Sequence, residues 1–175
     1  MATIDGHTGR VPHAFADIEQ EFLRYISKIV LCTVTTVSPE GLPRSRMLHP
    51  VFEVLEGEPV GWVCTGRTPV KVDHLARNPH VAICYWSPDN DTVYAECVAS
   101  WVEADADKRH VWDLFMRTPP PLGYDLSPYG SPESPQFTPL RLDPWRIQVM
   151  AGTEYPYGNL AGRIWRRAGS TTAPR

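Results

Sequence analysis

The segment Thr65–Lys71, with the sequence TGRTPVK, combines groups that can bind a phosphate. Thr68 followed by Pro69 predicts a helix start, because threonine suits the N-cap and proline suits the first helical position. Backbone N–H groups are free at such a start, and the positive end of the helix dipole favours an anion. Arg67 and Lys71 add positive charge, which is unfavourable for the helix alone and favourable beside a phosphate. An ordinary capped helix with surface charges has the same spacing.

A second basic feature lies in the segment GLPRSRMLHP, residues 41–50. Arg44 and Arg46 are two residues apart in a stretch expected to be extended, so both side chains leave one face of the strand. Two guanidinium groups on one face need an anion, carboxylates or open water. The apolar neighbours Leu42 and Met47 make a solvated face less favourable, and both explanations stay open.

The composition is that of a soluble globular domain. The 175 residues are 42% hydrophobic and 21% charged, with a net charge of −3. This balance argues against a nucleic-acid partner, and no run of about 18 apolar residues could cross a membrane. The first ten residues do not resemble a secretion signal, so we expect a cytoplasmic protein. We expect one domain over residues 1–154 and a C-terminal tail over 155–175.

Cysteine and histidine spacing does not indicate a metal site. The four cysteines never form a C-x-x-C pair, and each lies within an apolar run. Cysteines of this kind are usually small buried hydrophobic residues in a reducing compartment. The six histidines form no H-E-x-x-H or similar cluster. We therefore expect no bound metal.

Hydrophobic periodicity predicts a mainly β domain with few helices. Apolar residues at helical spacing predict helices over 13–28, 68–77 and 105–117. Runs rich in β-branched residues predict six strands, over 29–37, 42–55, 60–65, 81–86, 92–102 and 140–150. Tight turns between successive strands favour an antiparallel meander that closes into a small barrel and so removes its exposed edges. Pro144 should place an edge or a bulge within the last strand.

A proline-dense stretch over residues 118–139 separates the last predicted helix from the last predicted strand. It contains seven prolines, two glycines and two tyrosines. Because structureless loops are seldom this long, the stretch suggests a lid, a binding loop or a partner contact. A stiff surface excursion is equally compatible with the composition.

The order of these features resembles the pyridoxamine 5′-phosphate oxidase-like, FMN-binding split-barrel family. The resemblance spans roughly residues 20 to 151 and combines G-x-P-x-x-R, a strand ending in threonine, and K-x-x-x-L-x-x-N-P. The matching residues are Gly41, Pro43, Arg46, Thr65, Lys71, Leu75, Asn78 and Pro79. The resemblance implies a six-stranded antiparallel split β-barrel with short flanking helices, forming a homodimer that binds FMN at its interface.

The resemblance also implies roles for individual residues. Arg46 and Lys71 would hold the FMN phosphate, with hydrogen bonds from Thr65 and the helix start. Met47 and Leu48 would lie along the isoalloxazine, and Trp145 and Arg146 on its far side or in the partner subunit's wall. The full set of expected cofactor-binding residues is Arg44, Arg46, Met47, Leu48, Thr65, Arg67, Thr68, Lys71, Trp145 and Arg146.

Two departures from the family pattern limit the expected activity. Pro69 stands where many members have a serine, and no Arg-x-His triplet of the true pyridoxamine phosphate oxidases occurs near the C-terminus. We therefore expect an FMN-dependent oxidoreductase acting on another small molecule. No catalytic residue stands out, although His49, Tyr124 and Tyr129 are candidate acids or bases.

Two alternatives to an FMN enzyme remain. The first is a reductase of the same superfamily that uses the deazaflavin coenzyme F420. The longer anionic tail of F420 would need further cations, which Arg44 and Arg67 could supply. The second is a flavin- or haem-binding protein without turnover.

Overall fold

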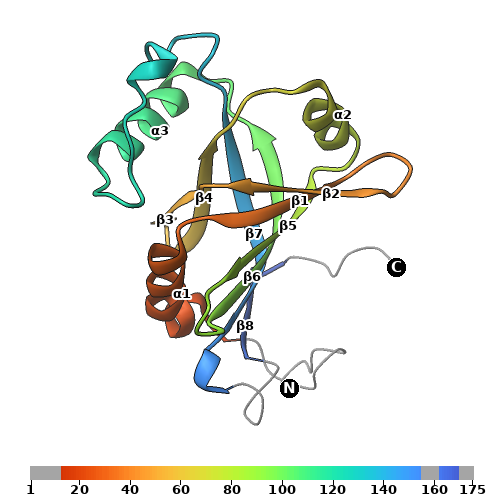
Figure 1. Cartoon of the computed structure of the whole chain (residues 1–175), viewed down its shortest axis with the longest axis vertical. Helices are drawn as coiled ribbons and strands as arrows, with labels where there is room; N and C mark the ends of the chain where they lie inside the picture. The colour runs from red at the N-terminus through yellow and green to blue at the C-terminus, as the bar shows by residue number, and fades with distance from the viewer. Residues whose placement is uncertain (1–12, 155–161, 170–175) are drawn as a thin grey trace.

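The computed structural model describes residues 13–154 and 162–169, which form eight strands, three α-helices and two short 3-10 turns (Figure 1). The helices are α1 (Phe15–Ile29), α2 (Pro69–Arg77) and α3 (Asp105–Arg117). The strands are β1 (Cys32–Val37), β2 (Pro43–Leu48), β3 (Val51–Leu55), β4 (Glu58–Cys64), β5 (His80–Trp86), β6 (Thr92–Trp101), β7 (Pro139–Met150) and β8 (Arg163–Arg166). The 3-10 turns are η1 (Ser127–Tyr129) and η2 (Gly152–Glu154).

All strands belong to one antiparallel sheet with the order β2-β1-β5-β6-β7-β4-β3, and β8 pairs with β7. β2 and β3 follow each other in the chain, yet they stand at opposite ends of this order. The sheet therefore curls around its core without a β2–β3 ladder. α1 packs against β5, β6, β7 and β8, where its apolar face joins the main core.

The three predicted helices are confirmed, but the expected count of six strands is wrong. The predicted strand over 42–55 is two strands, because the chain turns at His49 and Pro50. Pro50 has no N–H for a ladder, so β2 ends on β1 and the chain starts again as β3 on β4. β8 lies in the segment expected to be a tail, where Ile164 and Trp165 are buried.

Pro144 occupies a gap in the pairing of β7. β4 pairs with residues 139–142, whereas β8 pairs with residues 146–149, so neither strand needs an N–H from Pro144. On the other side of β7, the register with β6 shifts between Glu96 and Cys97. The predicted bulge is therefore present, at a point where β7 exchanges one neighbour for another.

The proline-dense stretch is packed against α3. Leu126 and Phe137 are fully buried and join α3 and the β3–β4 hairpin in a second core cluster. At Gly123 the backbone passes so close to the carbonyl of Thr118 that a Cβ would lie 1.8 Å from its oxygen. The stretch is thus packed in place over α3 and the β3–β4 hairpin.

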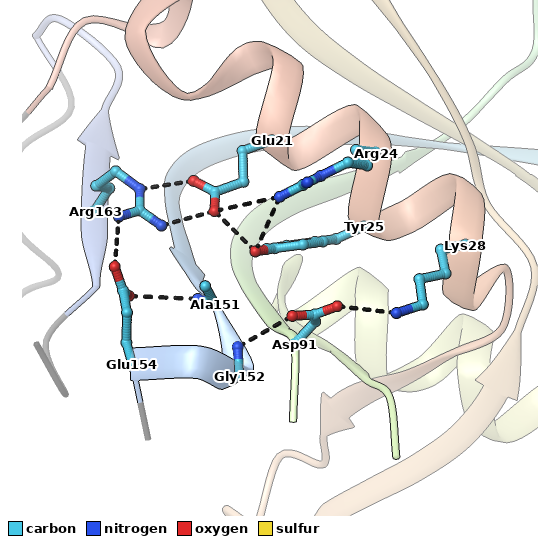
Figure 2. A network of polar contacts seen from close by, with 9 residues as sticks. All are labelled: Glu21, Arg24, Tyr25, Lys28, Asp91, Ala151, Gly152, Glu154 and Arg163. Carbon is cyan, nitrogen blue, oxygen red and sulfur yellow. Dashed lines mark hydrogen bonds and ion pairs between the residues drawn. The ribbon is translucent and has the colours of Figure 1, made fainter. Parts of the chain in front are cut away.

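A polar network fastens α1 to the opposite end of the sheet (Figure 2). Arg163 of β8 donates two hydrogen bonds to Glu21 of α1, at 2.6 and 2.7 Å, and one to Glu154 at 2.9 Å. Asp91, before β6, accepts hydrogen bonds from Lys28 of α1 at 3.2 Å and from the backbone N–H of Gly152 at 3.0 Å. The network attaches α1, which lies outside the backbone ladder, to β8 and to the segments next to β6 and β7. In the described ranges no helix is long and apolar enough to span a membrane.

Candidate anion and cofactor site

Arg46 is positioned by a buried hydrogen-bond chain between β1 and α2. The β1–β2 register pairs Thr36 with Arg44 and Val34 with Arg46, so both arginines leave the same face of β2. Arg46 Nη1 donates to Thr36 Oγ1 at 2.9 Å, and Thr36 Oγ1 is hydrogen-bonded to His74 Nδ1 at 2.9 Å. Thr36 and His74 are both buried, which holds the guanidinium next to α2.

Lys71 is the second cation of this site and has only 5% of its surface exposed. Its Nζ donates to Thr65 Oγ1 and, at 2.8 Å, to the carbonyl of Gly66. Burial lowers the pKa of Lys71, and the nearby charge of Arg46 lowers that pKa further. Thr65 and Gly66 supply only neutral oxygens, so the ammonium charge is uncompensated.

The two cations form a charge cluster without a counter-ion. Burial lowers the pKa of Arg46, and the neighbouring charge of Arg44 adds to this effect. Throughout residues 13–154 and 162–169, no carboxylate lies within ion-pair distance of Arg46 or Lys71. Because a buried positive charge is costly without a negative partner, this pair of side chains is poised for an anion.

The start of α2 adds neutral donors to the same place. Thr68 is the N-cap residue, with φ −67° and ψ 145°, and its side chain makes no capping hydrogen bond. Pro69 is the first helical residue and lacks an N–H, whereas the next N–H groups of a helix have no acceptor inside it. A phosphate fits this donor set: two cations, a free hydroxyl and a helix start.

Arg67 is turned away from this cluster. Its guanidinium forms an ion pair with Glu103 and lies over the Trp101 ring, 4.7 Å from the centroid. These contacts tie the turn after β4 to the junction between β6 and α3. The charge of Arg67 is therefore matched by a carboxylate, unlike that of Lys71.

Arg44 lies in a neighbouring cleft between the β1–β2 hairpin and α2, which Figure 1 shows beside each other. The cleft has a volume of about 450 Å³. Arg44 is exposed, and among the described residues it has no carboxylate within ion-pair distance. It extends the positive potential of Arg46 beyond the buried cluster.

Met47 and Leu48 leave opposite faces of β2. Met47 is 61% exposed, and Thr33 Oγ1 donates to its sulfur at 3.5 Å. Leu48 packs on the main core at the end of the strand. A ligand on one face of β2 can therefore contact the backbone and only one of these two side chains.

Trp145 and Arg146 belong to β7, which is four positions from β2 in the strand order. Trp145 lines a cleft together with Thr35 and Val37 of β1, on the face of the sheet opposite to Arg46. Arg146 donates to Glu96 at 3.0 Å and to Gln148 at 2.8 Å. Among the described residues, the buried Trp145 Nε1 has no hydrogen-bond partner, and the Trp145 ring lines a cleft of about 270 Å³ that Glu96 also lines.

The sequence analysis did not identify Thr36 and His74 as site residues. Thr36 could have been predicted from the turn at residues 38–41, because a hairpin with that turn pairs Thr36 with Arg44 and places it beside Arg46. His74 follows Lys71 by one helical turn, which brings both side chains to the side of α2 near β1.

The sequence analysis named His49 and Tyr124 separately, and the structure brings them together with Cys64. The Tyr124 ring is 5.0 Å from that of His49, and Tyr124 and Cys64 pack against the same core cluster. Burial lowers the pKa of His49, whereas it raises the pKa of Tyr124 and that of Cys64, the latter to about 12. All three groups are therefore neutral near pH 7. They form an uncharged wall beside Thr65.

A curled antiparallel sheet with a phosphate-type site between its β1–β2 hairpin and a helix start defines the class of flavin-binding split-barrel folds. A sequence profile described as pyridoxamine 5′-phosphate oxidase matches residues 18–151. The chain belongs to this family. A search of curated proteins finds no match.

Solved structures share the fold at low sequence identity. A Clostridium acetobutylicum protein related to general stress protein 26, of the pyridoxinephosphate oxidase family, has a TM-score of 0.63 and 14% identity, covering 86% of this chain and 94% of its own. A pyridoxamine 5′-phosphate oxidase-related, FMN-binding protein from Nostoc punctiforme has a TM-score of 0.57 and 17% identity, and the match covers 82% of this chain and 87% of its own. General stress protein 26 from Bacillus anthracis has a TM-score of 0.56 and 20% identity, and the match covers 84% of this chain and 99% of its own. These likenesses extend over most of each chain.

Proposed function

We propose that the chain is an FMN-binding oxidoreductase whose substrate is a small molecule other than pyridoxamine phosphate. The observation that carries the proposal is the pair Arg46 and Lys71, held together without a carboxylate beside the uncapped Thr68. Family membership supports FMN as the source of the phosphate, and the Nostoc punctiforme structure is of an FMN-binding protein. The missing Arg-x-His triplet argues against vitamin B6 oxidation.

In this proposal the protein binds and orients the flavin. FMN, when bound, accepts and passes on a hydride or electrons. Arg46, Lys71 and the start of α2 hold the phosphate, so the ring extends along the backbone of Met47 and Leu48. The neutral cluster of His49 and Tyr124 limits access of water at this end of the site.

The proposed assembly is a homodimer. Four exposed apolar side chains, from β2, β5 and β6, share the outer face of the sheet, and they are Met47, Trp86, Tyr94 and Val98. Trp145 lies with Thr35 on the face of the sheet opposite to Arg46, so we assign Trp145 and its neighbour Arg146 to the flavin of the other subunit. All four cysteines are free, which supports a reducing compartment such as the cytoplasm.

A coenzyme F420-dependent reductase is the second candidate, favoured by one observation. Arg44 lies beyond the phosphate site without a carboxylate partner, where a longer anionic tail would pass. Glu40 and Asp73 line the same cleft and would repel a tail of several carboxylates. FMN therefore remains the first candidate.

Titration of the apo-protein with FMN, followed by fluorescence quenching, tests the proposal. Arg46→Ala and Lys71→Ala should each raise the Kd for FMN about 10- to 100-fold, since each removes a hydrogen bond to a charged group. Arg67→Ala is the matched control, because Glu103 already engages that charge, and it should change the Kd less than about threefold. Unchanged affinity in both Arg46→Ala and Lys71→Ala would remove the phosphate assignment.

Parallel titrations separate the alternatives. Tight binding of F420 with no binding of FMN would favour the deazaflavin reductase. An enzyme should pass electrons from NAD(P)H to an acceptor faster than free FMN does. Binding of flavin or haem without such turnover would indicate a carrier or a sensor.

A further inference from the structure

The cleft beside Arg44 is built from two elements that face each other. The tip of the β1–β2 hairpin forms one side and α2 the other, and the volume of about 450 Å³ falls in the range of small-molecule pockets. The lining residues are Ser38, Glu40, Leu42, Pro43, Arg44, Pro69, Val70, Asp73 and His74. Of these, only Arg44 belongs to the residues expected to bind the cofactor, and the side chains of Arg46 and Lys71 do not line the cleft.

The walls of the cleft suit a flat ring. Leu42 and Pro43 line it from the hairpin, and Pro69 and Val70 line it from α2. Leu42 and Val70 are exposed apolar side chains, and a ring inserted between the two walls would remove both from water. The cleft therefore favours an aromatic or heteroaromatic group.

The polar groups of the cleft point to a ring that carries an amino group. Glu40 and Asp73 supply carboxylate oxygens, which accept hydrogen bonds from an exocyclic amine. Ser38 Oγ donates to Glu40 at 2.7 Å, and this hydrogen bond lowers the pKa of the carboxyl, so Glu40 is ionised at neutral pH. An adenine ring has both the flat faces and the amine.

The cleft is continuous with the phosphate site. Arg46 Nη1 donates to the carbonyl of Arg44 at 3.3 Å, and the Arg44 side chain lines the cleft. His74 lines the cleft too, and through Thr36 it holds Arg46. A second phosphate at Arg44 would thus follow directly on a first phosphate at Arg46 and Lys71.

We propose that this cleft binds an adenosine diphosphate moiety, with the adenine between the hairpin and α2 and the phosphate nearest the adenosine at Arg44, beside the site of the flavin phosphate. The inference rests on the anion site proposed above and extends it. Two cosubstrates carry this moiety: FAD, in which it continues from the flavin phosphate, and a nicotinamide dinucleotide that donates electrons.

Calorimetric titration with ADP tests the cleft, using two valines of α2. Val70 and Val72 are 38% and 39% exposed, and only Val70 lines the cleft. Val70→Trp should fill the cleft and raise the Kd for ADP at least about tenfold, whereas Val72→Trp should change it less than about twofold. Arg44→Ala should also raise the Kd for ADP about tenfold. No binding of ADP, or equal losses in the two tryptophan variants, would overturn the proposal.

FMN titrations of the same variants separate this proposal from the proposed function. Val70→Trp should keep the wild-type affinity for FMN, because the substitution retains the backbone N–H at the start of α2 and FMN has nothing to place in the cleft. Absence of FMN binding alongside cleft-dependent ADP binding would reject the flavin function and leave the nucleotide cleft. FMN binding without ADP binding would reject the cleft alone.

Two further titrations identify the cosubstrate. The cleft serves FAD if FAD binds more tightly than FMN to the wild-type protein and no more tightly than FMN to Val70→Trp. A nicotinamide dinucleotide is the source if NADH displaces ADP from the FMN-loaded protein. If neither result is obtained, the cleft does not serve a dinucleotide and the proposal is wrong in its substrate class.

Discussion

Lys71 is the residue whose environment is most unusual for its type. An ammonium group that is almost fully buried costs free energy unless an anion compensates its charge. Thr65 and Gly66 contribute neutral oxygens, and the positive charge of Arg46 adds to burial in lowering the pKa of Lys71. The free protein therefore carries an electrostatic cost at this position that a bound phosphate removes.

The pKa of Lys71 leads to a pH dependence of FMN binding. Burial and Arg46 hold this pKa below its usual value of 10.5, so the ammonium loses its proton at a lower pH than an exposed lysine. A bound phosphate favours the charged form, so binding and proton uptake are coupled. We expect the Kd for FMN to rise with pH above neutrality, beginning below pH 10.5, as measured by fluorescence titration.

Lys71→Arg is the control for this pH dependence. A guanidinium keeps its proton throughout the accessible range, so the rise in Kd assigned to Lys71 should disappear in that variant. Identical profiles for the wild-type protein and Lys71→Arg would show that another group titrates.

At the scale of elements, the network in Figure 2 fastens α1 to β8 far along the sheet from the anion site. Glu21 and Arg163 are both mostly buried and share two short hydrogen bonds in a fork geometry. Removing one partner would leave the other charged group without its main contact, in a place of limited solvation. The pair should therefore contribute to stability and leave the anion site unchanged.

The change Glu21→Gln should lower the free energy of unfolding by about 1 to 3 kcal/mol, measured by urea denaturation. Arg24→Ala is the matched control on the same helix. The Arg24 side chain is 66% exposed and its nitrogen is 3.9 Å from Glu21, so its loss should cost less than about 0.5 kcal/mol. FMN affinity should be unchanged in both variants. A weaker affinity for FMN in Glu21→Gln would contradict the independence of the α1–β8 network from the anion site.

At the scale of the whole molecule, one face of the sheet is apolar and exposed. Met47 is opposite Thr33, which is opposite Cys84, which is opposite Tyr94, so these side chains form a row across four strands. Trp86 lies on the same face and is 58% exposed. Several exposed apolar side chains gathered on one face are typical of a surface that a protein partner covers.

This face predicts the oligomeric state. Met47→Glu combined with Trp86→Glu should convert a dimer into a monomer in sedimentation experiments, because each dimer interface would bury four added carboxylates. Met116→Glu, at an exposed methionine of α3, should leave the dimer intact. A wild-type protein that is monomeric at micromolar concentration would contradict the assignment of Trp145 and Arg146 to a second subunit.

The features that depend on local geometry could be predicted from the sequence. Helical periodicity predicted the three helices, and the Thr68-Pro69 pair predicted where α2 begins. The period of two along a strand placed Arg44 and Arg46 on one face, which the β1–β2 register shows. The proline in β7 predicted a bulge that the β6–β7 register contains. Each of these follows from dihedral angles and side-chain direction within a few residues.

Which of these residues share an environment depends on contacts between distant parts of the chain. Pairing of distant strands brings Arg46 to Lys71 without a carboxylate, whereas Arg67 meets Glu103 and Arg146 meets Glu96. The same pairing splits the expected long strand at Pro50, recruits β8, and packs the proline-dense stretch over α3. Local periodicity carries no information about such partners, because the free energy of each contact depends on a residue far away in the chain.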